Sequence, residues 1–227
     1  MIFPKQYAII KIVKPVLPFG EEAYHMEKTQ IITIGRRCGS GGRIIGKTLA
    51  QKLGLPFYDK ELITEAAKQS GLCDKFMENF EETPTASLLY SLVMNAQQGG
   101  FYMGKPIELV AYEAQINAVR AAAAKGPCVI VGRCADYILK DDYDVVSVFI
   151  TASKEFRAAR VMEMDGISEK DAYAKIARVD KARASYHNYH AETKWGSSDS
   201  YELCIQSDRL PFEAAADLIC SYIKSRK

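Results

Sequence analysis

The sequence predicts an α/β fold, a three-layer sandwich in which helices cover both faces of a parallel sheet. Three observations support this prediction. The runs CVIVGR at 128–133 and VVSVFI at 145–150 are almost continuously apolar, as is typical of strands buried on both faces. Segments with helical periodicity alternate with such runs, which favours parallel strands joined by crossover helices. A chain of 227 residues with 48% hydrophobic side chains can bury such a core.

The first strand and helix are expected near the start of the folded region. Residues 31–34 are a short run of β-branched side chains and predict a buried strand. A helical period follows over 44–53, with Ile44 and Ile45 on its buried face, and glycine and proline end it. The sequence PFYD at 56–59 then supplies a short extended piece.

The next stretch, 60–126, is predicted to be helical without strands and is interpreted as an insertion on one edge of the sheet. Its last helix stops at Gly126 and Pro127. Residues 1–28 are interpreted as an N-terminal extension, which leaves 29–227 as the main domain.

The second half of the chain continues the alternation of helix and strand. Ser168 and Asp171 have the spacing of a capping box, which predicts a helix start at that point. We interpret 168–200 as a mobile cover. The elements expected here are helices at 153–165 and 168–190, a strand at 202–207 and a helix at 211–225.

Composition narrows the classes of function. The net charge of +2 gives no general case for binding nucleic acid or a membrane, and no apolar run approaches the ~20 residues of a membrane helix. No Cys-x-x-Cys pair occurs, which indicates reduced thiols in a cytoplasmic protein rather than a disulfide framework or a zinc site. The six cysteines are Cys38, Cys73, Cys128, Cys134, Cys204 and Cys220.

A phosphate-binding loop pattern, G-x-x-x-x-G-K-T, occurs literally from Gly41 to Thr48. Such a loop has to follow a strand directly, because its backbone amides converge on phosphate at the start of a helix. Gly46 lies twelve residues beyond the strand, and bulky isoleucines would stand inside the loop. We therefore place the real loop at 35–42, with the sequence GRRCGSGG.

The relocated loop lacks the usual lysine, because Gly42 and then Arg43 follow Gly41. Arg43 could supply positive charge one position later, and Ser40 is the only hydroxyl in the loop. The predicted anion site therefore consists of Gly39, Ser40, Gly41, Gly42 and Arg43. The alternative is a tight turn between strand and helix that binds nothing.

Four segments together resemble the cytidylate kinase-like family, relatives of bacterial CMP kinases. They are ITIGRRCGSGGRIIGKTLAQKLGLPFYDKELI, GPCVIVGRCADYIL, KARASYHNYHAETKWG and YELCIQSDRL, which occur in the family's order between Thr29 and Ile223. The resemblance implies a P-loop nucleoside monophosphate kinase fold with a core, an acceptor-binding insertion at 60–126 and a lid at 168–200.

The resemblance also implies roles for individual residues. Asp59 would face the acceptor nucleotide, and Arg133 would bind the acceptor phosphate. Cys134 stands where the CMP kinase pattern has an aspartate, and Asp136 follows two residues later, which leaves base selectivity open. The lid would place Asp180, Lys181 and Arg183 on the acceptor's sugar and phosphate.

Phosphoryl transfer between two bound nucleotides needs cations around the transferred group. We expect Arg43, Arg133 and Arg183 to be the catalytic arginines that supply this positive charge. The resemblance suggests that Arg157 or Arg160 approaches the donor nucleotide, although their spacing also fits a solvated helix face.

Several other side chains have alternative interpretations. His187 and His190 lack a third ligand, so no metal site is predicted. Tyr186, Tyr189 and Trp195 could stack on a base or pack the lid against the core. Cys38, near a helix N-terminus and two arginines, is hypothesised to be unusually reactive and shielded by nucleotide; the alternative is an inert small residue.

These features favour ATP-dependent phosphoryl transfer to a small phosphorylated acceptor, such as the pyrimidine nucleoside monophosphates CMP and dCMP. Magnesium would be held by substrate phosphates and water, because the usual hydroxyl is absent. The partners expected are small-molecule nucleotides, with neither nucleic acid nor membrane. The alternative is a catalytically degenerate nucleotide-binding sensor or scaffold, for which the missing lysine is the evidence.

Overall fold

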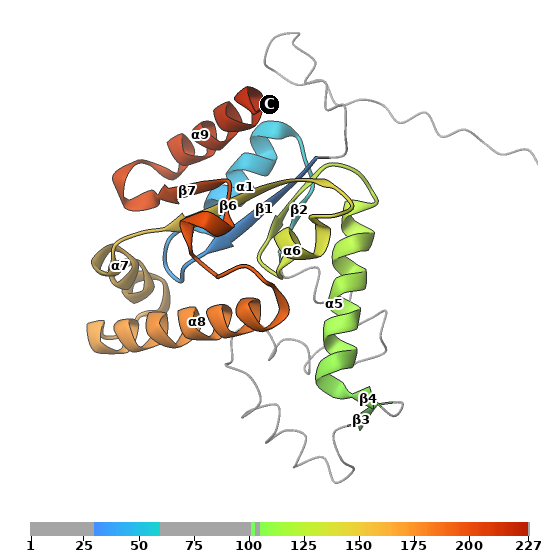
Figure 1. The fold of residues 1–227 in the computed structure, drawn as a ribbon. Helices are drawn as coiled ribbons and strands as arrows, with labels where there is room; N and C mark the ends of the chain where they lie inside the picture. The colour runs from blue at the N-terminus through green and yellow to red at the C-terminus, as the bar shows by residue number, and fades with distance from the viewer. Residues whose placement is uncertain (1–29, 60–100, 103–104, 227) are drawn as a thin grey trace, which may run out of the picture.

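The computed structural model describes residues 30–59, 101–102 and 105–226. Its centre is a five-stranded sheet with the strand order β2-β5-β1-β6-β7, shown in Figure 1. Neighbouring strands pair in parallel throughout the sheet, which confirms the predicted α/β class. The strands are β1 (Gln30–Arg36), β2 (Phe57–Tyr58), β5 (Cys128–Val131), β6 (Asp144–Thr151) and β7 (Leu203–Gln206).

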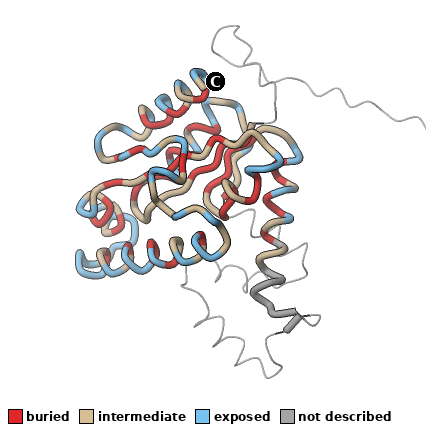
Figure 2. Tube along the Cα trace, viewed as in Figure 1, coloured by how far each residue is buried: buried red, intermediate tan, exposed pale blue. Residues whose placement is uncertain are grey.

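Helices cover both faces of the sheet. Alternate residues of β1 enter different cores, because successive side chains of a strand point to opposite faces. Ile32 and Ile34 pack with one pair of helices, α1 and α9, whereas Ile31 packs with α5 and α6. Figure 2 shows the buried sheet between helices whose outer faces are exposed. The helices are α1 (Gly42–Leu53), α5 (Ile107–Ala123), α6 (Ala135–Leu139), α7 (Lys154–Asp165), α8 (Glu169–His190) and α9 (Phe212–Ser225).

The start of α1 corrects one sequence expectation and confirms another. The helix begins at Gly42, so Gly46 and Lys47 of the literal loop pattern lie within it. A Cβ at Gly46 would lie 3.0 Å from Ile34 Cδ1, so this glycine allows close packing of helix on sheet. Ile45 is fully buried, but the prediction for Ile44 was wrong because that side chain is 46% exposed. Adjacent helix positions point about 100° apart, so both isoleucines cannot face the sheet.

The predicted insertion is only partly within the described residues. Helix α5 confirms its last helix, but the expectation of no strands was wrong for a short antiparallel pair, β3 (Phe101–Tyr102) and β4 (Lys105–Pro106). Residues 60–100 lie outside the described part of the chain, as do 1–29, which include the predicted N-terminal extension.

The predicted cover at 168–200 contains one continuous helix, α8, which packs against α7. Ser168 Oγ accepts a hydrogen bond from the Asp171 amide at 3.2 Å, which confirms the predicted helix start. Ala158 and Val161 of α7 meet Ala172 and Ile176 of α8 in a small core. Two 3₁₀ turns, η1 (Ser198–Ser200) and η2 (Ser207–Arg209), flank β7.

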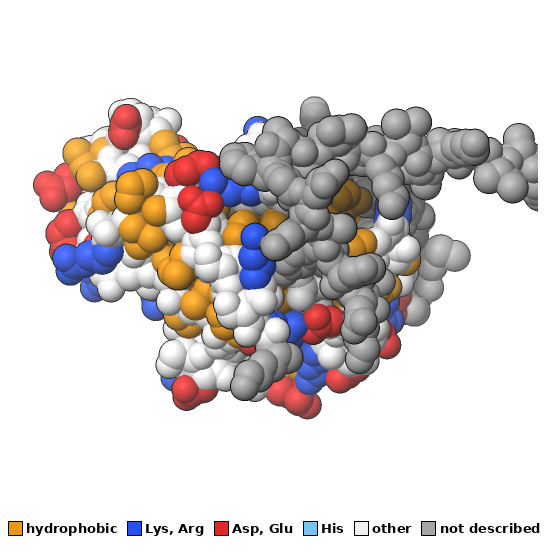
Figure 3. Space-filling view, turned by 90° about the horizontal axis from the view of Figure 1, so that it is seen from above, with side chains coloured by type: hydrophobic (Ala, Val, Ile, Leu, Met, Phe, Trp, Pro, Cys, Tyr) orange, Lys and Arg blue, Asp and Glu red, His pale blue; other side chains and the backbone are white. Residues whose placement is uncertain are grey.

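The surface of the described region is mixed in character. Figure 3 shows Lys and Arg side chains beside Asp, Glu and hydrophobic ones on the upper face, as the small net charge leads one to expect. Within the described ranges, no helix is both long enough and apolar enough to cross a membrane.

Candidate functional site

The relocated loop lies at the carboxyl edge of the sheet, between the end of β1 and the start of α1. Gly39 and Gly41 both have φ of 77°, in the left-handed region that favours glycine. Gly41 is the N-cap of α1 and offers no side chain to cap the helix. The first amides of α1 therefore keep their hydrogen-bonding capacity for a ligand, and the helix dipole favours an anion there.

The backbone carbonyls of this loop are all occupied. Because the C=O of one residue and the N–H of the next point in opposite directions, carbonyls held from outside turn the following amides toward the loop's interior. The amides of Gly39 and Gly41 are oriented in this way, and the Gly42 amide is the first amide of α1. The carbonyls of Arg37, Cys38, Gly39, Ser40 and Gly41 accept hydrogen bonds from Ser40, Arg157, Arg160, Ser207 and Ile45, respectively.

Close contacts around the loop explain why positions 39 and 41 are glycine. The position of Lys47 argues against the literal pattern. A Cβ at Gly39 would lie 2.6 Å from the Arg157 carbonyl oxygen, and one at Gly41 would overlap the Phe212 ring. Lys47, by contrast, is exposed on α1 one turn beyond the loop. The lysine of the literal match therefore does not face the loop.

Asp59 joins two arginines at the end of β2. Its buried carboxylate accepts a hydrogen bond from Arg43 Nε, and Arg36 Nη2 lies 3.9 Å from its Oδ1. The Arg43 side chain is 59% exposed. The structure thus brings the residue predicted for the donor phosphate, Arg43, into contact with the one predicted for the acceptor. Arg43 remains accessible to a ligand from its exposed side.

Arg133 lies in an unusual turn after β5. Strand β5 ends at Val131 rather than at 133 as expected, because Gly132, Arg133 and Cys134 all have positive φ, at 77°, 65° and 51°. Positive φ is uncommon outside glycine and often marks a functional turn. The Arg133 carbonyl accepts a hydrogen bond from Gln115 Nε2 at 3.2 Å.

Arg133 remains protonated at neutral pH although its side chain is buried. Burial lowers its pKa to about 10, nearby Tyr186 and Asp59 oppose that shift, and Arg183 adds to it. A pKa of about 10 leaves the guanidinium protonated at neutral pH. Gly132, directly before Arg133, lies against the guanidinium of Arg36, which in turn pairs with Asp59.

Arg183 reaches the same edge from α8. Its Nη1 donates to the Arg36 carbonyl at 3.3 Å, directly before the loop. Arg43, Arg133 and Arg183 therefore come together from α1, the turn after β5, and α8, around Asp59. Lys181, predicted to bind the acceptor, is exposed on α8.

Asp180 and Arg157, which the resemblance places near nucleotides, contact the loop and each other in the structure. Asp180 Oδ1 accepts the Cys38 amide at 2.7 Å, and its Oδ2 accepts Arg157 Nη1 at 2.7 Å. Arg157 also donates to the Cys38 carbonyl at 3.2 Å. Arg160 Nε donates to the Gly39 carbonyl at 3.1 Å, and its guanidinium lies 4.7 Å from the centre of the Phe212 ring. These side chains hold the loop from behind.

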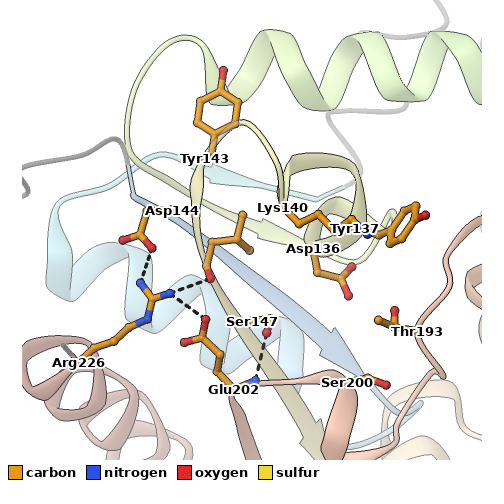
Figure 4. A pocket seen from close by; sticks show the side chains of 11 residues that line it. Asp136, Tyr137, Lys140, Tyr143, Asp144, Ser147, Thr193, Ser200, Glu202 and Arg226 are labelled. Carbon is orange, nitrogen blue, oxygen red and sulfur yellow. Dashed lines mark hydrogen bonds and ion pairs between the residues drawn. The ribbon is translucent and has the colours of Figure 1, made fainter.

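A separate polar hollow of about 380 Å³ lies between α6, β6 and the segment before β7, and is shown in Figure 4. Asp136, predicted as a substrate residue, lines this hollow near Thr193 and not the arginine cluster. Arg226 crosses another part of it and pairs with Asp144 at 2.5 Å and Glu202 at 2.8 Å. Burial raises the pKa of Asp136.

His187 lies behind the same hollow. Its Nδ1 lies 3.7 Å from Cys134 Sγ, and its Nε2 lies 2.9 Å from Thr193 Oγ1. Burial lowers the pKa of His187, while the Asp136 charge opposes that shift. His190 stacks on Tyr112 with ring centroids 3.7 Å apart. Within the described residues, no three His, Cys, Asp or Glu side chains are arranged to hold a metal ion.

The aromatic residues of the predicted cover mostly pack against the protein. Trp195 meets Phe149 edge-on with centroids 5.2 Å apart, and the Tyr186 hydroxyl accepts Gln115 Nε2 at 2.5 Å. Tyr189 is 84% exposed. Packing is therefore the better interpretation for Trp195 and Tyr186.

The cysteines within the described ranges are free thiols, in agreement with the prediction; Cys73 lies outside them. Cys38 is half-buried in the loop.

Sequence reasoning missed Ser207, whose single hydroxyl proton is shared between the Ser40 carbonyl oxygen at 2.6 Å and the Thr151 carbonyl oxygen at 3.0 Å. A signal was available, because Ser207 directly follows β7 at the carboxyl edge, where ligands of parallel sheets bind. Gln115 was also missed, and it lies on a helix far from the loop in sequence, with no pattern to mark it.

The chain is similar to one protein family and to several proteins of known structure. The cytidylate kinase-like family matches residues 31–209. A solved structure of an uncharacterized protein from Eubacterium ventriosum ATCC 27560 is 36% identical, with a TM-score of 0.66, and the match covers 88% of this chain and 100% of that one. A solved shikimate kinase from Acinetobacter baumannii in complex with shikimate is 15% identical, with a TM-score of 0.49 and coverage of 88% and 95%.

Among curated proteins, a shikimate kinase of Bartonella quintana (strain Toulouse) is 31% identical over 115 residues, which are 47% of this chain. The match spans about half of that relative, 51% of its length. The family match includes the loop, Asp59, Arg133 and Arg183 and extends over most of the sequence. The chain therefore belongs to the cytidylate kinase-like family.

Proposed function

We propose that the protein transfers the terminal phosphoryl group of ATP to a small phosphorylated acceptor, a pyrimidine nucleoside monophosphate such as CMP or dCMP. The main support is the loop at the start of α1, whose carbonyls are held outward so that amides face a ligand. A polyphosphate is the ligand that such a loop at a helix N-terminus binds best.

The chemistry would consist of alignment and charge stabilisation. The amides of Gly39, Gly41 and Gly42 would hold the donor phosphates, and Arg43 would neutralise charge on the transferred group. Cations placed around the transferred group stabilise a transition state whose charge spreads over the phosphoryl oxygens. Arg43 would have to move from Asp59 toward the phosphates, and its exposed side chain has room to do so.

The acceptor would lie between Asp59, Arg133 and Arg183. Two guanidinium groups suit a phosphate, and a carboxylate accepts hydrogen bonds from a sugar or base. Mg²⁺ bound with ATP would supply further neutralisation of phosphate charge. Ser40 does not fit as its ligand, because it is fully buried and its hydroxyl donates to the Arg37 carbonyl at 2.9 Å. Phosphates and water would therefore hold the ion.

The test compares two substitutions on α1. Wild-type protein with ATP and Mg²⁺ is incubated with CMP, dCMP, UMP and shikimate, and the phosphorylated products are quantified. Charge-assisted hydrogen bonds contribute about 1.5–3 kcal/mol, so Arg43→Ala should lower kcat/KM by about 10- to 150-fold. Lys47→Ala, which removes the exposed lysine of the literal pattern, should leave it within about twofold of wild type.

Loss of activity in Lys47→Ala with none in Arg43→Ala would overturn the loop assignment. Phosphorylation of shikimate alone would retain the phosphotransfer but refute the nucleotide acceptor.

The sensor interpretation is the second candidate. Its support is that Gly42 occupies the lysine position and that Arg43 is already paired with Asp59. Tight ATP binding by calorimetry, without phosphorylation of any compound in the panel, would favour it over catalysis.

A further inference from the structure

We infer that the ion pair between Arg157 and Asp180 is a clamp that sets the orientation of the phosphate loop, and that both are positioning residues rather than nucleotide contacts. This inference rests on the proposed function only in that the oriented loop is the one proposed to bind phosphate. The clamp itself consists of contacts from α7 and α8 to the backbone of Cys38.

The clamp holds both backbone groups of a single residue. Asp180 accepts the Cys38 N–H at 2.7 Å, and Arg157 donates to the Cys38 carbonyl at 3.2 Å. The two side chains also pair with each other at 2.7 Å. One peptide unit is thus held on each side of the Cys38 Cα by opposite charges, from helices that are joined through their own small core.

Both side chains are mostly buried, although they also line a hollow of about 360 Å³ beside α7 and α8. The Arg157 side chain is 5% exposed and that of Asp180 is 11% exposed. Arg157 Nε donates to the Ala152 carbonyl at 3.1 Å, and both carboxylate oxygens of Asp180 accept hydrogen bonds. Arg157 therefore has its guanidinium committed to the protein, and the nucleotide role that the resemblance suggested for it is replaced by one behind the loop.

The pair orients the loop in a way that packing alone would not. A buried ion pair can often be replaced by apolar side chains without loss of stability, so stability does not account for the charges here. The hydrogen bond from Arg157 fixes the Cys38 carbonyl outward, and the Gly39 amide must then point inward. An apolar pair would fill the same space but leave that peptide free to rotate.

The test uses a variant that removes both charges of the clamp. Arg37 Nη1 also lies 3.5 Å from Asp180 Oδ2 and loses this partner, but its side chain is 36% exposed and remains in contact with water. In Arg157→Met/Asp180→Leu, both charges are replaced together. The matched control is Glu163→Leu/Arg178→Met, which removes one acid and one arginine from the same two helices at exposed positions. The free energy of unfolding in urea, the Kd for ATP and the rate of Cys38 alkylation by iodoacetamide, followed by peptide mass spectrometry, are measured for each.

For the clamp variant we expect wild-type stability, Cys38 alkylation at least fivefold faster and a Kd for ATP at least tenfold weaker. The control should match wild type in all three. Cys38 alkylation at the wild-type rate in a folded clamp variant would overturn the inference. If wild-type protein binds no ATP, the proposed function fails, and the alkylation rates still test the clamp.

A second variant tests the same inference if the first variant does not fold. Arg157→Lys keeps a positive charge beside Asp180 but cannot make the three hydrogen bonds of the guanidinium at once. Its Cys38 alkylation rate should lie above that of wild type. An unchanged rate in this folded variant would also refute the clamp.

Discussion

At the scale of single residues, Gly41 combines two constraints that usually occur apart. Its φ of 77° disfavours side chains, and an added Cβ would overlap the Phe212 ring. Gly166, which ends α7, has a similar φ of 66° but nothing within 4 Å of an added Cβ. Substitutions at the two positions therefore distinguish two costs. Backbone strain occurs at both, whereas steric overlap occurs only at Gly41.

We predict that Gly166→Ala lowers the free energy of unfolding by about 1–2 kcal/mol, the cost of a left-handed side chain. Gly41→Ala should cost more than this, because the Phe212 ring must also move, and ATP affinity should fall with it. Urea denaturation and calorimetry measure the two effects. Equal losses of stability in both variants would show that the Phe212 contact is unimportant.

At the scale of elements, α8 shows that a local signal can predict where a helix starts without deciding what the helix contacts. The cap at Ser168 was recognised from its spacing to Asp171 and forms as expected. The helix it opens was predicted to be part of a mobile cover, and in the structure its residues Val179 and Asp180 are buried, with Asp180 accepting a hydrogen bond from the loop. Helix α8 is thus one wall of the candidate site.

We predict that Ser168→Ala lowers the free energy of unfolding by about 1 kcal/mol, because an amide at the start of α8 loses its acceptor. Ser197 is the matched control, since it occupies the N-cap position of η1 without a side-chain hydrogen bond to it. Ser197→Ala should change stability by less than about 0.5 kcal/mol. Urea denaturation of both variants at one pH measures the two losses of stability. A larger loss for Ser197→Ala than for Ser168→Ala would contradict the assignment of Ser168 as the stabilising cap of α8.

At the scale of the whole molecule, the parallel sheet gathers residues that are distant in sequence. The carboxyl ends of β1, β2 and β5 meet at one edge, so the loop, Asp59 and Arg133 become neighbours. Burial of polar side chains at and behind this edge couples the stability of the fold to pH, and His187 and Asp136 are the clearest case.

Burial shifts the pKa values of His187 and Asp136 in opposite directions, so the two groups have opposite effects on stability as the pH falls. Burial lowers the pKa of His187, so below about pH 6.5 the unfolded state binds the proton first and stability falls with falling pH. Burial raises the pKa of Asp136, so the folded state retains that proton longer, and this contribution to stability is lost as the pH rises above about 4.

We predict that unfolding free energy falls between pH 7.5 and pH 5.5 in wild type, and that His187→Gln reduces this fall by up to about 1 kcal/mol. Asp136→Asn should have the opposite effect and make the fall steeper, because it removes the negative charge that opposes the lowering of the His187 pKa. Urea denaturation at both pH values tests this. A fall that His187→Gln leaves unchanged would exclude this histidine as its source.

Local patterns in the sequence determined the strand–loop–helix unit and its position. The β-branched run at 31–34, the glycines at 39–42 and the cap at Ser168 act through the backbone of adjacent residues, so sequence spacing is enough to recognise them. For the same reason the literal pattern at Gly41–Thr48 could be rejected before the fold was known.

Only the tertiary structure decided which side chains meet. Asp180 lies 142 residues from Cys38, and Arg157 lies 119 residues from it, yet both bind its backbone. Arg43 and Asp59 were assigned to different substrates, and the structure shows that they pair with each other. Such contacts depend on which helices pack together and how far each side chain reaches, and no spacing along the chain records either.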